Sequence, residues 1–392
     1  MHNEGKAPNY LVRRLVGWQA GRIVDPVERL KFLRRTVGNR QADAAVVGSG
    51  ATRWRRRVLG LMAGAAALLA PSAYVADRGT IIRPVPSSPG VAQAGSFTTN
   101  VWLVDQNQEF ETYSNGLRIE RRFETANEPR HYVWFVRGEE DSRPAVAGTQ
   151  PSGIVYHTTE SQLAPFAQDT TPRLKYLGES LLHYVREQKA YHFVVDRFGR
   201  VWRIVRESDA AWHAGASVWS DGERTWVSLN HSFLGVSLEA GTEGNVSGRA
   251  PATPAQIHAL RVLTEMLRAK YHIAAINCIT HAQVSVNPSN MQVGYHTDWA
   301  AQFPYGALGL PDNYAQPMPG LYLFGFKYDP SLITATGERY WKGLLLGEEQ
   351  LRQDATAHGL TAGEWRRRLN ARYRTVQSEI KERSAEAKEK QG

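Results

Sequence analysis

The chain has 392 residues, of which 42% are apolar, so it can bury a sizeable core and is not disordered as a whole. Its net charge is +9, but residues 1–57 alone hold 13 Lys and Arg against 4 Asp and Glu, and the other residues hold 34 of each sign. The basic charge therefore belongs to an N-terminal arm, and the balanced remainder argues against a nucleic-acid-binding protein.

An uncharged segment, residues 58–76, directly follows Arg55, Arg56 and Arg57. As a helix it is just long enough to span a hydrocarbon core of roughly 30 Å, and the basic flank marks its cytoplasmic side. We interpret it as an uncleaved signal anchor; a cleaved signal peptide and a buried helix of a soluble domain are the alternatives. The larger part of the chain would then lie outside the cytoplasm, on the periplasmic or cell-wall side, tethered to the membrane.

Pro, Ser and Gly concentrate in residues 77–95, which predicts a linker to a globular domain. Alternating apolar runs between residues 97 and 136 predict a few strands, and residues 153–156 predict a buried strand. Residues 174–188 have helical spacing, residues 191–196 and 201–205 flank a hairpin turn, and residues 234–238 predict another strand. We place a domain at residues 96–330, with its core at 152–302.

The clearest helix start is at Thr253, where Thr is the cap, Pro254 takes the first helical position and Gln256 completes a capping box. A short strand over residues 275–280 follows the helix. The order of elements predicts an α/β fold with a mainly mixed central sheet flanked by helices. Residues 331–392 are rich in charged side chains in a pattern typical of helices, which predicts a C-terminal helical extension.

Two histidines, His157 and His281, each follow the end of an apolar strand. Strand ends are where a sheet presents side chains to a crevice, which makes both residues candidates for a functional site. A lone histidine is more often structural than a metal ligand, so position alone does not decide the matter. The only cysteine, Cys278, excludes an intrachain disulfide; it lies on the opposite strand face from residue 281 and is expected to be a buried apolar residue.

Several motifs come in a recognisable order. They are residues 154–159 (IVYHTT), 191–202 (YHFVVDRFGRVW), 211–215 (AWHAG), 234–239 (LGVSLE) preceded by Asn230, the helix over 253–271, and 279–281 (ITH). Together they resemble the N-acetylmuramoyl-L-alanine amidase family, which includes T7-type lysozymes and peptidoglycan recognition proteins. The resemblance runs from about residue 152 to residue 299.

The resemblance implies that His157 and His281 bind a catalytic Zn²⁺, which needs three protein ligands and one open position. The family's third ligand is usually Asp or Cys about ten residues after the second histidine, and here Gln292 stands at that position. We assign His296 as the third ligand on ligand chemistry, with Asp298, or no third ligand, as the alternatives.

By the same resemblance, Tyr191 is the catalytic residue that donates a hydrogen bond to the developing oxyanion, with Glu239 as a reserve acid or base. A packing role is the alternative for Tyr191. The family's assisting Lys is replaced by Asn290. His213 and Asn230 match positions that bind the stem peptide of the substrate; the alternative is that they cap and turn a loop.

The resemblance implies a zinc-dependent amidase that cuts the bond between N-acetylmuramic acid and L-alanine in peptidoglycan or muropeptides. The alternative is a non-catalytic peptidoglycan-binding module that keeps the fold but lacks a complete set of metal ligands. No nucleic-acid partner is expected.

Overall fold

The computed structural model describes residues 100–137, 146–241, 252–328, 330–337 and 341–389. The predicted arm, anchor and linker, residues 1–57, 58–76 and 77–95, lie outside these ranges. Among the residues that the structure does describe, no helix combines the length and apolar character needed to cross a membrane. Residues 96–392 form a compact unit of their own.

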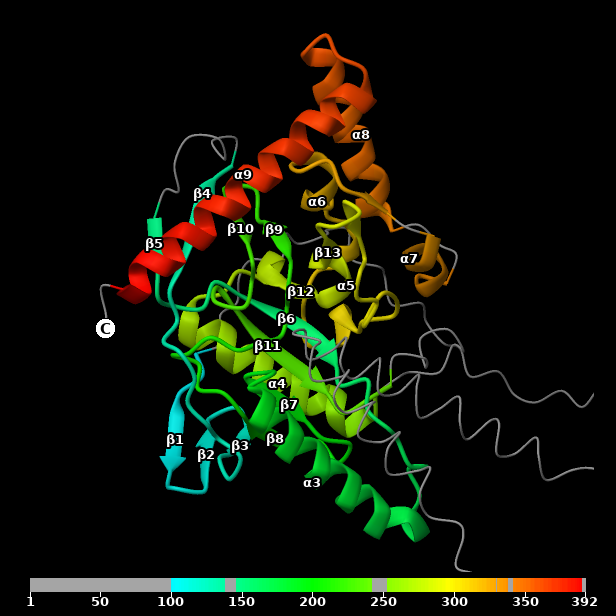
Figure 1. Ribbon diagram of the computed structural model, residues 1–392. Helices are drawn as coiled ribbons and strands as arrows, with labels where there is room; N and C mark the ends of the chain where they lie inside the picture. The colour runs from blue at the N-terminus through cyan, green and yellow to red at the C-terminus, as the bar shows by residue number, and fades with distance from the viewer. Residues whose placement is uncertain (1–99, 138–145, 242–251, 329, 338–340, 390–392) are drawn as a thin grey trace, which may run out of the picture. The chain divides into compact units, whose positions relative to one another are not determined.

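The unit is built on an eight-stranded mixed sheet in the order β1-β2-β3-β8-β7-β11-β6-β12 (Figure 1). Its central strands β7, β11, β6 and β12 are parallel, and β8 is antiparallel to β7. The mixed α/β architecture predicted from the sequence is confirmed. The bounds are β1 Leu103–Gln106, β2 Phe110–Tyr113, β3 Arg118–Glu120, β6 Gly153–Thr158, β7 Phe193–Val195, β8 Val201–Arg203, β11 Phe233–Leu238 and β12 Cys278–Thr280.

Helix α4 (Pro254–Tyr271) covers one face of this sheet. Its start has the predicted capping box: the Thr253 side chain accepts from Gln256 N, and the Gln256 side chain accepts from Thr253 N. Leu260, Leu263 and Met266 follow at helical spacing and pack against the side chains that β6, β7 and β11 place on that face. Burying this apolar stripe fixes the helix on the sheet.

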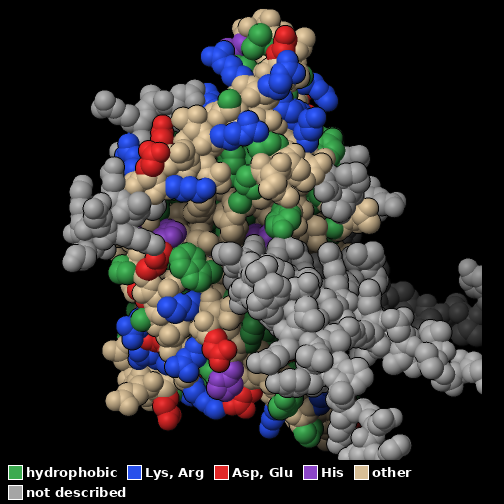
Figure 2. Space-filling view, in the orientation of Figure 1, with side chains coloured by type: hydrophobic (Ala, Val, Ile, Leu, Met, Phe, Trp, Pro, Cys, Tyr) green, Lys and Arg blue, Asp and Glu red, His purple; other side chains and the backbone are tan. Residues whose placement is uncertain are grey.

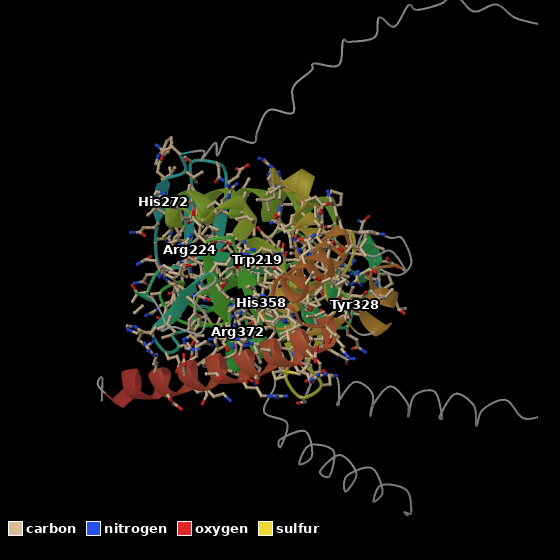
Figure 3. All side chains as sticks on the ribbon, turned by 90° about the horizontal axis from the view of Figure 1, so that it is seen from above. Trp219, Arg224, His272, Tyr328, His358 and Arg372 are labelled. Carbon is tan, nitrogen blue, oxygen red and sulfur yellow. The ribbon has the colours of Figure 1, made fainter. Side chains whose placement is uncertain are left out.

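The opposite face is covered by two elements. Helix α3 (Thr171–Gln188) packs Leu182 and Val185 over β7 and β8. A second, four-stranded sheet in the order β5-β4-β10-β9 supplies Trp219 and Trp226, which pack with Val155 of β6. Trp219 is buried, and Figure 3 labels it near the middle of the view. The bounds of this sheet are β4 Tyr132–Val136, β5 Val146–Gly148, β9 Val218–Ser220 and β10 Arg224–Val227.

The chain beyond the main sheet folds back on the same unit. Helices α8 (Lys342–Ala357) and α9 (Ala362–Glu389) lie in the region predicted to be helical, and they share a core with residues 282–326. Figure 3 shows α9 along the outer side of the unit. The other elements here are α5 His281–Val284, α6 Pro319–Tyr322, α7 Pro330–Ala335, β13 Val286–Asn287, β14 Gln292–Val293 and β15 Lys327–Tyr328.

Lys and Arg side chains gather at the top of the view in Figure 2, over α8 and the start of α9. Arg352, Arg367 and Arg368 are exposed there. Over the rest of the visible described surface, side chains of both signs are mixed. The local basic cluster therefore lies on the C-terminal helices and not on the main sheet.

Candidate metal centre

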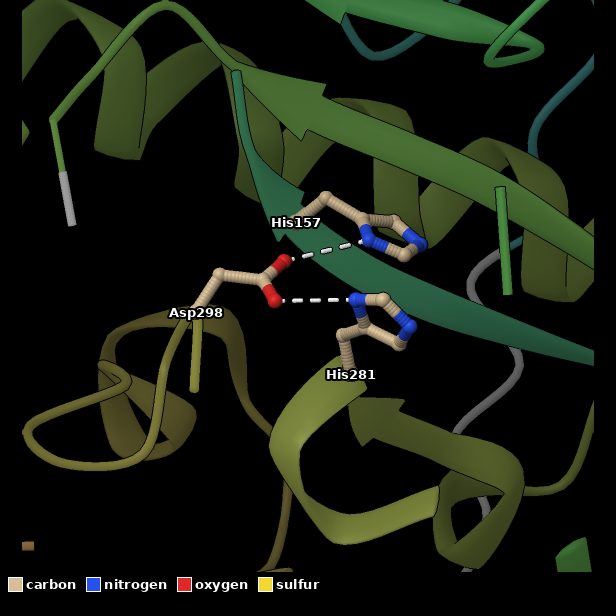
Figure 4. Close-up of side chains that lie close together, drawn as sticks. All are labelled: His157, His281 and Asp298. Atoms are coloured by element: carbon tan, nitrogen blue, oxygen red, sulfur yellow. Dashed lines mark hydrogen bonds and ion pairs between the residues drawn. The ribbon is translucent and has the colours of Figure 1, made fainter. Parts of the chain in front are cut away.

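Three side chains from distant parts of the chain converge: His157 at the end of β6, His281 at the start of α5, and Asp298 (Figure 4). One Asp298 carboxylate oxygen lies 3.2 Å from Nδ1 of His157, and the other lies 2.8 Å from Nδ1 of His281. One ligand atom from each residue falls within 4.8 Å of the others, and all three side chains are buried. The two strand-end histidines selected from the sequence therefore do meet.

Local structure explains the position of His281. Thr280 caps the short helix α5, with its backbone N–H donating to Oε1 of Gln283 at 2.9 Å. This capping box turns the chain sharply where β12 ends. The side chain of the first helical residue, His281, is thereby placed beside the end of β6.

Two contacts hold Asp298 in place. Its backbone carbonyl accepts from the backbone N–H of Ala282, next to His281. The indole of the following residue, Trp299, donates to the carbonyl of His157 at 2.9 Å, and Trp299 is fully buried. The chain around Asp298 is thus attached to both of the elements that carry the histidines.

His296 and Gln292 make contacts other than those of Asp298. The ring of His296 stacks on that of His281, with centroids 4.5 Å apart and planes inclined by 18°. Gln292 lies in β14, where its side-chain oxygen accepts from Asn290. Within the described residues, the group of converging His, Cys, Asp and Glu ligand atoms contains Asp298 and not His296.

The protonation of the group follows from its surroundings. Burial lowers the pKa of His157, the neighbouring His281 ring lowers it further, and the result is about 4 in spite of Asp298. Burial alone would raise the pKa of Asp298, but the two imidazoles hold it well below its usual range. At neutral pH His157 is therefore neutral and Asp298 is ionised.

Counting protons tests whether this group suits a cation. Asp298, His157, His213 and the Phe233 carbonyl form a row of three contacts, because Nε2 of His157 lies 3.1 Å from Nδ1 of His213, and Nε2 of His213 lies 3.2 Å from Phe233 O. Both ends of the row can only accept, so three contacts need three protons, whereas two neutral imidazoles bring two. A cation held by Asp298 and His157 would supply the missing positive charge.

The atoms that converge are Nδ1 of His157, Nδ1 of His281 and the two carboxylate oxygens of Asp298. Imidazole nitrogens and carboxylate oxygens are the donors that zinc prefers in three-ligand catalytic sites. The residues present therefore fit a zinc ion held by His157, His281 and Asp298.

Comparison with known proteins relates this part of the chain to a protein family. Residues 147–298 match the family model described as N-acetylmuramoyl-L-alanine amidase. Residues 147–298, which we call the amidase domain, are thus similar to this family. The resemblance predicted from the sequence motifs is confirmed over this segment, and members of the family are in general zinc-dependent.

Two curated relatives match part of the chain. The N-acetylmuramoyl-L-alanine amidase AmiD of Escherichia coli is 33% identical over 138 residues, which cover 30% of this chain and 49% of the relative. The 1,6-anhydro-N-acetylmuramyl-L-alanine amidase AmpD of Haemophilus influenzae is 29% identical over 109 residues, which cover 28% of this chain and 53% of the relative. The chain thus spans about half the length of the curated relatives that it matches.

Solved structures of similar proteins include AmiD of E. coli in complex with anhydro-N-acetylmuramic acid-L-Ala-D-gamma-Glu-L-Lys. It is 25% identical with a TM-score of 0.32, and the alignment covers 51% of this chain and 75% of that one. AmpDh3 of Pseudomonas aeruginosa is 18% identical with a TM-score of 0.36, covering 53% and 92%.

Tyr191, the sequence candidate for oxyanion stabilisation, lies beside the metal group of the amidase domain. Its ring centroid is 5.2 Å from that of His157. Burial raises the pKa of Tyr191, and the negative charge of Asp298 raises it further. The phenol therefore keeps its proton and can donate a hydrogen bond. Its catalytic role stays a prediction.

Glu239, the reserve acid or base, has its contacts in the turn between β7 and β8. One of its carboxylate oxygens accepts from the backbone N–H of Arg197 at 3.1 Å, and the side chain faces Gly178 of α3. Burial raises the pKa of Glu239, and the negative charge of Asp196 in the same turn raises it further. The structure gives Glu239 a role in holding this turn, and a role in the reaction stays a prediction.

His213 and Asn230, the candidates for peptide binding, both have partners inside the amidase domain. The Asn230 side-chain oxygen accepts from the backbone N–H groups of His213 and Ala214, at 3.0 and 2.7 Å. His213 is buried against His157, so the loop-holding alternative from the sequence describes these contacts. Their contact with a substrate stays a prediction, and the His213–His157 contact was not foreseen, because 56 residues separate the two.

Proposed function

We propose that the protein is a zinc-dependent N-acetylmuramoyl-L-alanine amidase that hydrolyses the amide bond between N-acetylmuramic acid and L-alanine in peptidoglycan or its muropeptides. The observation that carries the proposal is the convergence of His157, His281 and Asp298 inside the amidase domain. The names of AmiD and AmpD support the bond and the substrate class.

Asp298, and not His296, is the third metal ligand in this proposal. The Asp298 carboxylate already bridges the two Nδ1 atoms, whereas the His296 ring is stacked flat on His281. A ring stacked in this way directs its in-plane lone pairs alongside those of His281 and not toward a shared point. His296 then packs against the face of the His281 ring.

Bound zinc supplies a Lewis acid and a water of lowered pKa. Tyr191, protonated and beside His157, donates a hydrogen bond to the oxygen that gains negative charge in the transition state. Asp298 stays ionised and places a carboxylate oxygen beside each of the two Nδ1 atoms, so that the three side chains can hold the ion together. The complete three-residue group favours this enzyme over a non-catalytic peptidoglycan-binding module.

The location of the protein stays a proposal drawn from the sequence. The basic arm and the apolar segment at 58–76 support a membrane anchor with the amidase domain on the periplasmic or cell-wall side. Peptidoglycan lies on that side of the membrane, so the proposed substrate and the proposed location agree.

The test is incubation of the purified full chain with isolated peptidoglycan sacculi. We expect release of stem peptides with a free L-alanine amino group, a stoichiometric zinc content, and loss of both in His157→Ala. The exposed His258 provides the matched control, since His258→Ala removes a histidine outside the site. A wild-type protein that binds sacculi without releasing peptide would support the non-catalytic module instead.

A further inference from the structure

His213 holds a place behind the metal group that metal binding by itself does not explain. Its imidazole is buried, with Nδ1 3.1 Å from Nε2 of His157 and Nε2 3.2 Å from the carbonyl oxygen of Phe233. The two ring nitrogens thus bridge a metal-site histidine and the backbone of β11. His213 itself is not one of the converging metal-binding side chains.

The direction of these hydrogen bonds can be worked out. A carbonyl oxygen only accepts, so Nε2 of His213 carries the proton, and Nδ1 of the neutral ring is left as an acceptor. Nε2 of His157 must then be the donor to it. In a neutral His157 this leaves Nδ1 without a proton, and Nδ1 is the atom that faces Asp298.

We propose that His213 is a positioning residue that selects the metal-binding tautomer of His157, by accepting its Nε2–H while anchored to the Phe233 carbonyl. This inference rests on the proposed zinc site, and it gives His213 a role inside the protein in place of contact with a stem peptide. Hydrogen-bonding the distal ring N–H of a metal ligand fixes its tautomer and orientation and raises its basicity.

The surrounding chain is shaped to hold this ring. Gly235 of β11 lies directly under it: a Cβ atom at residue 235 would be 2.5 Å from Cγ of His213, closer than any real contact. The Asn230 side chain fixes the loop by accepting the backbone N–H of His213. Three separate positions, Asn230, Phe233 and Gly235, therefore determine where Nδ1 of His213 points.

The register of β6 and β11 places Gly235 close to the strand that carries His157. In this parallel pair Gly235 lies opposite Val155, and Ser237 lies opposite His157. Gly235 leaves the space that the His213 ring occupies while it contacts His157. A side chain at residue 235 would close that path.

The test compares zinc affinity of the full chain, measured by competition with a chelator, for His213→Leu and His213→Asn. Leu fills space without accepting a hydrogen bond, so we expect zinc affinity to fall about 10- to 100-fold. The Asn side-chain oxygen lies at about the same distance from the backbone as Nδ1 and can accept, so we expect His213→Asn to recover most of the loss.

A second measurement observes the hydrogen bond directly. In the zinc-loaded wild type with ¹⁵N-labelled histidine, we expect the Nε2–H signal of His157 to show scalar coupling to Nδ1 of His213. The control variant is Thr264→Val, which removes a buried hydrogen bond to the Tyr156 hydroxyl. It controls for destabilisation, and we expect its zinc affinity to be unchanged.

The outcomes separate this inference from the proposed function. If the wild type binds zinc and His213→Leu binds it equally well, or if the coupling is absent from the loaded protein, His213 only packs and the inference is wrong. If the wild type binds no zinc, the zinc site itself fails, and the inference fails with it.

Discussion

Oδ1 of Asp298 lies 2.8 Å from Nδ1 of His281, although 17 residues separate them in the chain. The loop between the two forms α5 and the β13–β14 hairpin and then returns, with Asp298 O accepting from Ala282 N. This closure brings a carboxylate, and not the intervening imidazole of His296, to the end of β6.

The assignment of the third ligand predicts different results for two variants. We expect Asp298→Ala to lower zinc affinity at least about 100-fold. Removing a residue that only hydrogen-bonds a metal ligand typically lowers affinity about 10- to 100-fold, and Asp298 is itself a ligand in this account. His296→Ala removes a stacked neighbour and is expected to lose less than Asp298→Ala. Zinc content and chelator competition measure both; a reversed order would restore His296 as the ligand.

Tyr191→Phe tests transition-state stabilisation. The substitution removes only the hydroxyl, so we expect kcat on muropeptides to fall about 10²- to 10³-fold, as for loss of one oxyanion donor. KM and zinc content should change little, because the phenol is not a ligand. Steady-state kinetics together with metal analysis check this expectation.

Glu239→Gln is the matched comparison for Tyr191→Phe. The contacts of Glu239 are with Arg197 and the face of α3, and a Gln oxygen can still accept from Arg197 N. We therefore expect kcat to stay close to that of the wild type. A fall as large as that of Tyr191→Phe would give Glu239 the acid or base role suggested by the sequence.

Gly235→Ala tests the space beneath His213. A Cβ there would clash with the His213 ring, so we expect the free energy of unfolding to fall by about 1–3 kcal/mol through overpacking. Denaturant unfolding measures the loss. At Gly306 a Cβ meets nothing within 4 Å, so Gly306→Ala is the control and should change stability by less than about 0.5 kcal/mol.

The buried pair Glu111–Arg203 predicts a pH dependence of stability. Burial alone would raise the pKa of Glu111, but two short hydrogen bonds from Arg203 and its charge lower it to about 2. A lowered folded-state pKa means that the stabilisation is complete above the unfolded value of about 4.5 and is lost as the pH falls toward 2.

The measurement for this pair is unfolding by denaturant between pH 6 and pH 2. We expect the wild type to lose stability more steeply below pH 4.5 than Glu111→Gln, which has no carboxyl group to protonate at this position. Equal slopes for the two proteins would mean that the pair does not contribute in this way.

The sequence predicted those parts of the site that depend on local patterns. His157 and His281 could be found because each follows an apolar strand. Helix α4 could be found because Thr253, Pro254 and Gln256 form a recognisable helix start. The order of the motifs then led to the amidase family. Each of these patterns spans only a few residues, so it can be recognised without knowledge of the fold.

The parts that could not be predicted depend on how distant segments close on one another. Counting residues along the loop placed Gln292 at the ligand position, but Gln292 pairs with Lys327 of β15 in a separate small sheet. Asp298 is placed by Trp299, whose indole donates to His157 O across 142 residues of chain. Nothing near Asp298 in the sequence reveals that contact.

The most direct measurement is a crystal structure of the zinc-loaded protein with anomalous diffraction at the zinc edge. The account predicts one zinc ion bound by Nδ1 of His157, Nδ1 of His281 and a carboxylate oxygen of Asp298, at about 2.0–2.2 Å from each. A zinc ion bound by His296 in place of Asp298, or no zinc between His157 and His281, would contradict it.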